Sequence, residues 1–211
     1  MSLPARIITG PQDLEEGTAW LAANVAGFAD VLAQTGPLPL RLKPAGFGGL
    51  LEIIISQQVS VASANAIRER MTQAGLVCQT AVRDAGIDGL RAAGLSRPKA
   101  RYALALAQAA LDYDALSQMP DDAVIAVLCE QLGIGPWTAQ IYVMFCLGRA
   151  DAFPPGDLAL QESARRMFDL PARPDAPLLD AMSQEWSPWR SVAARALFAY
   201  YRILKNREGL G

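Results

Sequence analysis

The sequence contains no histidine among its 211 residues, and this absence excludes several kinds of active site. Serine–histidine–aspartate triads, cysteine–histidine pairs and histidine-based zinc sites all require an imidazole ring. Any acid–base chemistry must therefore be carried out by carboxylates, lysine, tyrosine or water.

Cysteine is scarce as well, and Cys78, Cys129 and Cys146 lie far apart in the chain. An odd number of widely spaced cysteines indicates thiols in a reducing compartment rather than disulfides or cluster ligands. The longest apolar run, residues 50–55, is interrupted by Glu52 and falls far short of the roughly 20 residues of a membrane span. The first residues do not resemble a signal peptide. We therefore expect a cytoplasmic protein without membrane contact.

The net charge of −2 at pH 7 and the pI near 5.2 are averages that argue against nucleic-acid binding. Basic residues nevertheless outnumber acidic ones near the C-terminus, where Arg190, Arg195, Arg202, Lys205 and Arg207 stand against Glu185 and Glu208. Local charge decides whether a face can attract DNA. On charge alone, such a cluster is more often an ordinary solvated helix face.

Ala, Leu, Gln, Glu and Arg dominate the long segments, and strand-like alternation is rare. The patterns predict helices at about 12–34, 46–57, 60–74, 97–112, 121–131, 136–148, 157–168 and 187–206. Residues 38–42 are the one plausible extended piece. Breaks rich in proline and glycine near 36–46 and 150–156 divide the chain. We expect an all-α fold with two helical lobes and a central cleft, one lobe formed by residues 46–150 and the other by 1–45 plus 151–211.

The most informative stretch is Leu132-Gly133-Ile134-Gly135-Pro136-Trp137-Thr138-Ala139, which joins two predicted helices. Gly133 and Gly135 permit backbone conformations that a Cβ would forbid, and Pro136 suits the first position of a helix. The turn would leave amide groups exposed at a helix N-terminus, where they attract phosphate. By itself, the pattern is slightly better explained by a tight helix connection without any ligand.

The longer pattern resembles the helix-hairpin-helix (HhH-GPD) DNA glycosylases. After the hairpin comes Phe153-Pro154-Pro155-Gly156-Asp157, similar to the family's loop that ends in an aspartate. Three further stretches resemble family motifs: residues 53–62, 94–100 and 186–191. The last of these is similar to the 3-methyladenine DNA glycosylase II (AlkA-type) branch. The resemblance places the helix-hairpin-helix at about 121–148 in the first lobe and the aspartate loop in the second.

Departures from the family pattern refine this expectation. Trp137 stands where strand-cutting relatives carry a nucleophilic lysine, so the resemblance implies a monofunctional enzyme. The scattered cysteines cannot hold an iron–sulfur cluster. The chain leaves no room for the N-terminal β domain of larger AlkA-type enzymes, which predicts a compact form. Gln58 stands where the branch carries an intercalating leucine.

Asp157 is the predicted catalytic residue. Its position before a helix would by itself indicate an N-cap. Within the family motif, a carboxylate here could stabilise the positive charge that develops on deoxyribose and orient the attacking water. The two roles are compatible, since a cap needs only one oxygen.

The predicted base pocket consists of aromatic residues that could favour a cationic alkylated base by stacking: Trp137, Trp189, Tyr142 and Trp186. Each could instead be a core residue. The predicted DNA contacts comprise the hairpin, the possible plug and nearby basic residues: Gly133, Ile134, Gly135, Thr138, Gln57, Gln58, Arg190, Lys99 and Arg97. The resemblance implies no side-chain metal site and no cofactor for the chemistry. A Na⁺, K⁺ or Mg²⁺ ion could bridge the hairpin backbone at 132–135 to a phosphate.

The resulting hypothesis is a monomeric glycosylase that acts on damaged double-stranded DNA. It would flip out and hydrolytically excise alkylated purines such as 3-methyladenine and 7-methylguanine, leaving an abasic site for a downstream endonuclease. Three alternatives stay open: a glycosylase for a deaminated or oxidised base, a non-catalytic protein that binds damaged DNA, and a helical bundle that binds an unrelated small molecule.

Overall fold

The computed structural model describes residues 6–207, and within that range it is helical. Twelve α-helices and one 3-10 turn make up the regular structure of these residues. The β pairing in the same range is limited to an isolated bridge between Ile7 and Arg149. The predicted all-α class is confirmed. None of the helices in the described part of the chain combines the length and apolar character that crossing a membrane requires.

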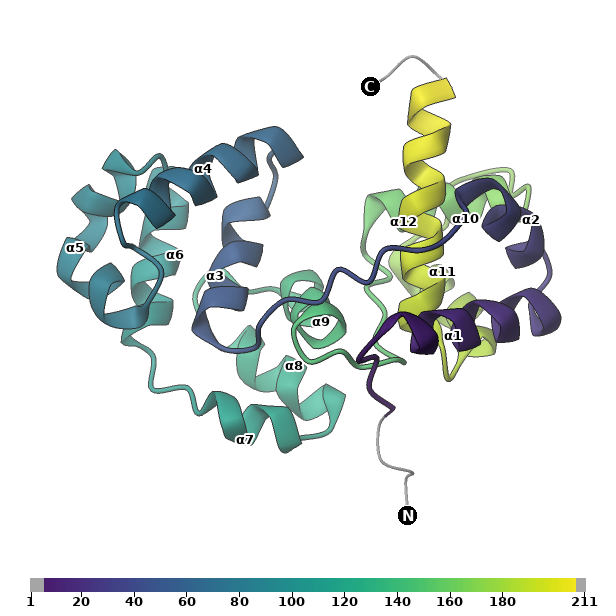
Figure 1. Ribbon diagram of the computed structural model, residues 1–211, viewed down its shortest axis with the longest axis horizontal. Coiled ribbons are helices and arrows are strands. Elements are labelled where there is room, and N and C mark those ends of the chain that lie inside the picture. The colour runs from purple at the N-terminus through teal and green to yellow at the C-terminus, as the bar shows by residue number, and fades with distance from the viewer. Residues whose placement is uncertain (1–5, 208–211) are drawn as a thin grey trace. The chain divides into compact units, whose positions relative to one another are not determined.

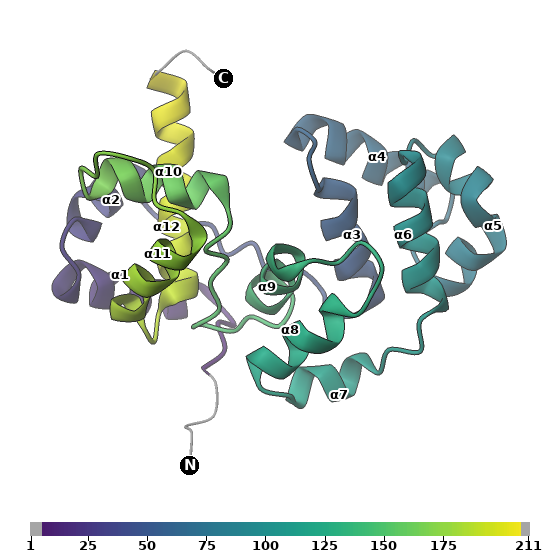
Figure 2. The same ribbon diagram turned by 180° about the vertical axis from the view of Figure 1, so that it is seen from behind.

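The helices form two compact units, shown from both sides in Figures 1 and 2. The first unit comprises the chain up to Leu42 and from Gly148 onward, and its elements are α1 (Pro11–Asn24), α2 (Phe28–Thr35), α10 (Leu158–Met167), α11 (Ala176–Ser183), η1 (Gln184–Trp186) and α12 (Arg190–Arg207). The second unit is Lys43–Leu147, and its elements are α3 (Phe47–Ser56), α4 (Val61–Gln73), α5 (Gln79–Ala92), α6 (Arg97–Gln108), α7 (Tyr113–Gln118), α8 (Asp121–Cys129) and α9 (Pro136–Phe145). The predicted lobe boundaries, after residues 45 and 150, lie three residues beyond those of the units.

Helix α3 forms the centre of the second unit. It packs against α4, α6 and α9, and its Leu50, Ile53 and Ile54 side chains are buried. A helix that is apolar on nearly every side has to be enclosed by others. The end of α3 is therefore held firmly, and the loop that follows it starts from a fixed point.

Helix α12 has the corresponding place in the first unit, where it contacts α1, α2 and α10. Its buried side chains include Ala193, Ala194 and Ala196, whose small size allows neighbouring helices to approach closely. On α1, a Cβ added to Gly17 would lie 2.7 Å from Val192 Cγ2 and 2.8 Å from Trp189 Cε3. Glycine at this position thus permits α1 to lie directly on the start of α12.

Several predicted elements were wrong in detail. The single helix expected at 12–34 is divided into α1 and α2 at Gly27, whose φ of +85° ends the helical path. Helices α5, α7 and α11 were not predicted, because α5 contains Gly86 and Gly89 and the other two have only six and eight residues. Residues 38–42 form no strand in the described chain.

Candidate functional site

The connection between α8 and α9 is a tight hairpin built on two glycines with different tasks. Gly133 has a φ of +82°, and a Cβ at this position would overlap the ring of Tyr102. Gly135 is the N-cap of α9, with extended backbone and open space where a Cβ would stand. Gly133 is thus required by the fold, whereas Gly135 is not.

The N-terminus of α9 forms the predicted phosphate-binding feature. Pro136 occupies the first turn of α9 and has no N–H to offer. The amides of the residues that follow it lie at the positive end of the helix dipole. The Ile134 side chain is buried, and its N–H donates to the Gln131 carbonyl over 3.1 Å. The Ile134 amide is therefore used by the turn itself. The remaining candidates for binding phosphate are the backbone N–H groups around Gly135 and in the first turn of α9.

These two glycines give a matched pair of variants. We expect Gly133→Ala to destabilise the protein by about 1–3 kcal/mol, because a left-handed backbone conformation is combined with a steric clash. We expect Gly135→Ala to fold normally and to bind damaged and undamaged duplexes more weakly alike, since phosphate contacts do not distinguish lesions. Urea denaturation and fluorescence anisotropy at several salt concentrations measure both effects. Full DNA affinity in a folded Gly135→Ala protein would mean that the turn is only structural.

Gln57 connects the end of α3 to the hairpin. Its side-chain Nε2 donates to the Gly133 carbonyl over 3.1 Å and to the Thr138 hydroxyl over 2.9 Å. Thr138 is only 3% exposed, so its hydroxyl supports the hairpin from inside. The Gln57 and Thr138 side chains therefore brace the hairpin from inside. Gln57 is half-buried, and its predicted contact with DNA stays a prediction.

Gln58 follows with a φ of +54°, a left-handed conformation that is uncommon outside glycine. Its side chain is exposed. A polar residue held exposed and strained at the tip of a short loop is suited to contact with a partner. The predicted plug role of Gln58 is compatible with this position.

Lys99 has a different role from the predicted phosphate contact. It is 9% exposed, and its Nζ donates to the Ile55 carbonyl over 2.7 Å and to the Gln57 carbonyl over 2.5 Å. Burial lowers the pKa of this ammonium group. The charge is committed to the last carbonyls of α3, where a cation is favoured by the helix dipole.

Arg190 is likewise engaged inside its own unit. Its Nε lies 3.0 Å from Asp151 Oδ1 and its Nη2 lies 2.9 Å from Asp151 Oδ2. Asp151 also accepts hydrogen bonds from the Arg190 N–H and the Ser187 hydroxyl. This ion pair fixes the loop before Asp157 to the start of α12. Nothing near Asp151 in the sequence indicates this role, because its partners lie 36 and 39 positions away.

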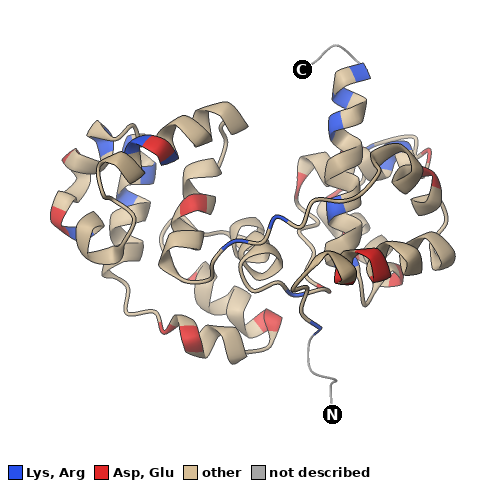
Figure 3. Cartoon of the chain, in the orientation of Figure 1, with Lys and Arg blue, Asp and Glu red and all other residues tan. Residues whose placement is uncertain are grey.

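Of the predicted basic contacts, Arg97 is exposed at the start of α6 and stays a prediction. Figure 3 shows further basic residues along the C-terminal half of α12, where Lys205 and Arg207 lie in the last turn.

Asp157 is the N-cap of α10. Its Oδ1 accepts hydrogen bonds from the Ala159 N–H over 2.8 Å and from the Leu160 N–H over 3.3 Å. The Asp157 N–H donates to the Pro154 carbonyl, and the side chain is partly exposed. Both capping bonds end on the same oxygen, and they fix the orientation of the carboxylate. The expected cap is therefore present, and it is compatible with a second role.

The four predicted pocket aromatics differ sharply in exposure. Trp186 is 1% exposed and packs edge-on against Phe28 and Phe153. Trp189 is 2% exposed, with the Arg6 guanidinium carbon 4.2 Å from its ring centroid. A base cannot stack on a ring without an exposed face, so packing accounts for both tryptophans in this conformation.

Tyr142 is also buried, and its hydroxyl accepts a hydrogen bond from the Gly46 N–H over 2.8 Å. Burial raises the pKa of this phenol. Trp137, in the first turn of α9, is the one member of the predicted pocket with a partly exposed side chain. It is therefore the best placed of the four to meet a base.

Among residues 6–207, no cluster of three or more His, Cys, Asp or Glu side chains could hold a metal ion. The hairpin offers only backbone oxygens, which suit hard cations such as Na⁺, K⁺ or Mg²⁺. The Gly133 carbonyl already accepts a hydrogen bond from Gln57. A carbonyl oxygen has a second lone pair, so this bond is compatible with a cation contact.

Comparison with known proteins gives matches in both sequence and structure. Residues 51–188 match the model of the HhH-GPD superfamily base excision DNA repair proteins. YfjP of Bacillus subtilis, provisionally named as a DNA-3-methyladenine glycosylase, is 32% identical over 76% of this chain, and the match spans only 60% of that protein.

Two solved structures are similar over most of the chain. One is a DNA-3-methyladenine glycosidase from Bacillus halodurans, with a TM-score of 0.76, 26% identity and coverage of 97% of this chain and 95% of that one. The other is the 3-methyladenine DNA glycosylase Mag1 of Schizosaccharomyces pombe in complex with abasic DNA. It has a TM-score of 0.77 and 24% identity, covering 87% of this chain and 95% of that one, and this likeness shows the fold alone.

Proposed function

The chain belongs to the HhH-GPD superfamily of base excision DNA repair proteins, and on this basis we propose that it is a monofunctional DNA glycosylase for alkylated purines. The reaction hydrolyses the bond between a purine such as 3-methyladenine or 7-methylguanine and its deoxyribose, and it leaves an abasic site. The names of the two most informative relatives support this substrate class, since both refer to 3-methyladenine.

The observation that carries the proposal is the fixed carboxylate of Asp157 at the start of α10. Its Oδ1 is held by the Ala159 and Leu160 amides, so the group does not need to reorganise during the reaction. As the base departs, positive charge develops on the sugar, and an oriented anion lowers the energy of that transition state more than that of the ground state. A carboxylate can also orient the attacking water.

The substrate supplies the rest of the driving force. Alkylation at a ring nitrogen makes the purine cationic and a good leaving group, so no general acid is needed. In our proposal the partly exposed Trp137 stacks on the flipped base, where a cation gains about 0.5–2 kcal/mol over a neutral ring. This preference would favour alkylated bases over normal ones.

Binding to the duplex is assigned to the second unit. The start of α9 would contact a phosphate through backbone amides, with or without a bridging cation. The exposed Gln58 would fill the space left by the flipped nucleotide. A few phosphate contacts and a modest basic content predict a moderate dependence of affinity on salt. We further propose that the protein acts as a cytoplasmic monomer and passes its product to an abasic-site endonuclease.

The test of this proposal uses methylated duplex DNA with borohydride present during turnover. Trp137 occupies the position of the lysine in strand-cutting relatives, so no Schiff base can form there. We expect release of free 3-methyladenine and 7-methylguanine, no covalent protein–DNA adduct, and strand breaks only after separate alkali treatment. Abundant trapping would overturn the monofunctional assignment. Tight binding to the methylated duplex without any base release would favour a non-catalytic damage-binding protein.

A further inference from the structure

The loop between α3 and α4 is fixed from two directions. Lys99, on α6, donates to the carbonyls of Ile55 and Gln57. Gln57 in turn donates to the hairpin through its side chain. Gln58 lies between these contacts and Ser60, the N-cap of α4. Its φ of +54° is an unfavourable backbone conformation.

A strained conformation of a non-glycine residue persists only where the surrounding structure over-determines it. Here the preceding residue, Gln57, is held at two points. Its carbonyl accepts a hydrogen bond from the Lys99 ammonium, and its side chain donates to the hairpin. Release of either restraint would let Gln58 relax toward ordinary backbone angles. Its side chain would then point elsewhere.

From this geometry we propose that Lys99 is a positioning residue that holds Gln58 in the orientation required to occupy the space of a flipped nucleotide. The proposal rests on the proposed function, because it assigns a task within base flipping. Lys99 does not touch the DNA in this account, and it acts through the Gln57 carbonyl and the backbone of Gln58.

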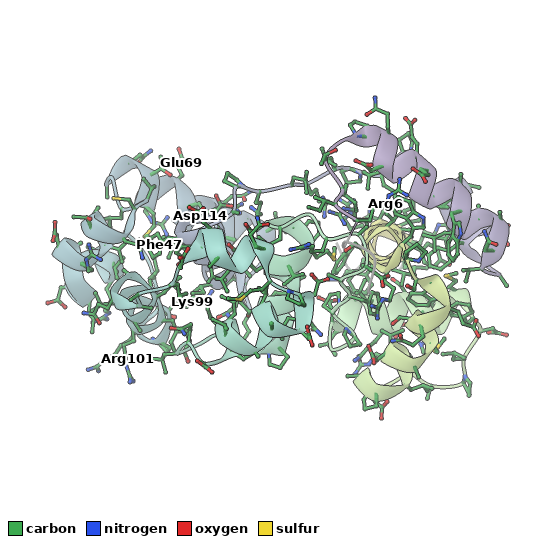
Figure 4. The ribbon with its side chains drawn as sticks, turned by 90° about the horizontal axis from the view of Figure 1, so that it is seen from below. Arg6, Phe47, Glu69, Lys99, Arg101 and Asp114 are labelled. Atoms are coloured by element: carbon green, nitrogen blue, oxygen red, sulfur yellow. The ribbon has the colours of Figure 1, made fainter. Side chains whose placement is uncertain are left out.

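Lys99 and Arg101, both on α6, allow the positioning role of Lys99 to be distinguished from a general effect of its positive charge on DNA binding. Figure 4 shows Lys99 within the second unit and Arg101 at its edge, pointing outward. Lys99 is 9% exposed, whereas the Arg101 side chain is exposed to solvent. Arg101→Met therefore removes one positive charge from the same helix without altering the loop, and it serves as the matched control.

The experiment is a double-mutant cycle with Lys99→Met and Gln58→Gly. Methionine keeps most of the length of lysine and removes both hydrogen bonds. Glycine accepts the left-handed backbone and removes the plug side chain. The affinity of each variant is measured for a duplex with a tetrahydrofuran abasic site and for an undamaged duplex. Thermal denaturation checks that each variant is folded. If Lys99→Met does not fold, Lys99→Gln replaces it, because glutamine stays polar but lacks the charge and the reach of the ammonium group.

We expect Lys99→Met and Gln58→Gly each to weaken binding to the abasic duplex by about tenfold, and the double variant to bind no more weakly than Gln58→Gly alone, as for residues that act as one unit. Affinity for the undamaged duplex should stay within about twofold of the parent in each variant, and Arg101→Met should behave like the parent on the abasic duplex. Multiplied losses in the double variant, or equal losses on both duplexes, would overturn the positioning role. A parent protein without preference for the abasic duplex would instead contradict the proposed function, so the two failures can be told apart.

Discussion

Replacing Asp157 by asparagine should lower the single-turnover rate of 3-methyladenine excision by about 10²-fold or more, the cost typical of losing one preorganised electrostatic group. Asparagine has nearly the same size, and its side-chain oxygen can still accept the hydrogen bonds from Ala159 and Leu160. The variant therefore removes the negative charge and leaves the cap.

Stability and binding give the controls for this variant. We expect the thermal denaturation midpoint to change little, because the capping bonds persist. Affinity for a duplex that contains a lesion should survive or increase, since an anion near the phosphate backbone has been removed. If Asp157 were only a cap, Asp157→Asn would keep both its stability and most of its activity.

Trp189 was predicted to line the base pocket, but its side chain is buried. Trp189 lies between Gly17 and Arg6 in the core of the first unit. We expect Trp189→Ala to reduce the free energy of unfolding by about 3–5 kcal/mol, as for other large-to-small core substitutions. This is a substantial part of the roughly 5–15 kcal/mol that stabilises a typical domain. Urea denaturation followed by circular dichroism measures it.

Trp137→Ala is the comparison for this variant. Because Trp137 is partly exposed, its loss should cost little stability and should reduce excision of cationic 7-methylguanine more than that of neutral hypoxanthine. If Trp189→Ala kept the parental stability and lost excision of cationic bases selectively, Trp189 would be a base-pocket residue after all.

Local sequence features predicted the parts of the fold and site that depend on neighbouring residues. The cap at Asp157 and the turn at Gly133 follow from residue types within a few positions, and so does the break at Pro136. The single helix expected at 12–34 was wrong because Gly27 adopts a left-handed conformation that ends α1 and starts α2, and the helix-favouring composition of the segment does not reveal it.

Roles that depend on distant contacts were not predictable in this way. Lys99 looked like a surface cation, since nothing in its own stretch indicates that the carbonyls of Ile55 and Gln57 come within its reach. Asp151 was missed for the same reason. Burial, which separates Trp137 from Trp186 and Trp189, is a property of the packed helices and cannot be obtained from the spacing of aromatic residues.

A panel of single-lesion duplexes would show whether this protein excises alkylated purines, as we propose. Each duplex carries 3-methyladenine, 7-methylguanine, hypoxanthine, uracil or 8-oxoguanine at one position, and base release is measured under single-turnover conditions. We expect rapid release of the two methylated purines, slower release of hypoxanthine and no release of uracil or 8-oxoguanine. Release of uracil or 8-oxoguanine in preference to the methylated purines, or no release from any duplex, would contradict the proposal.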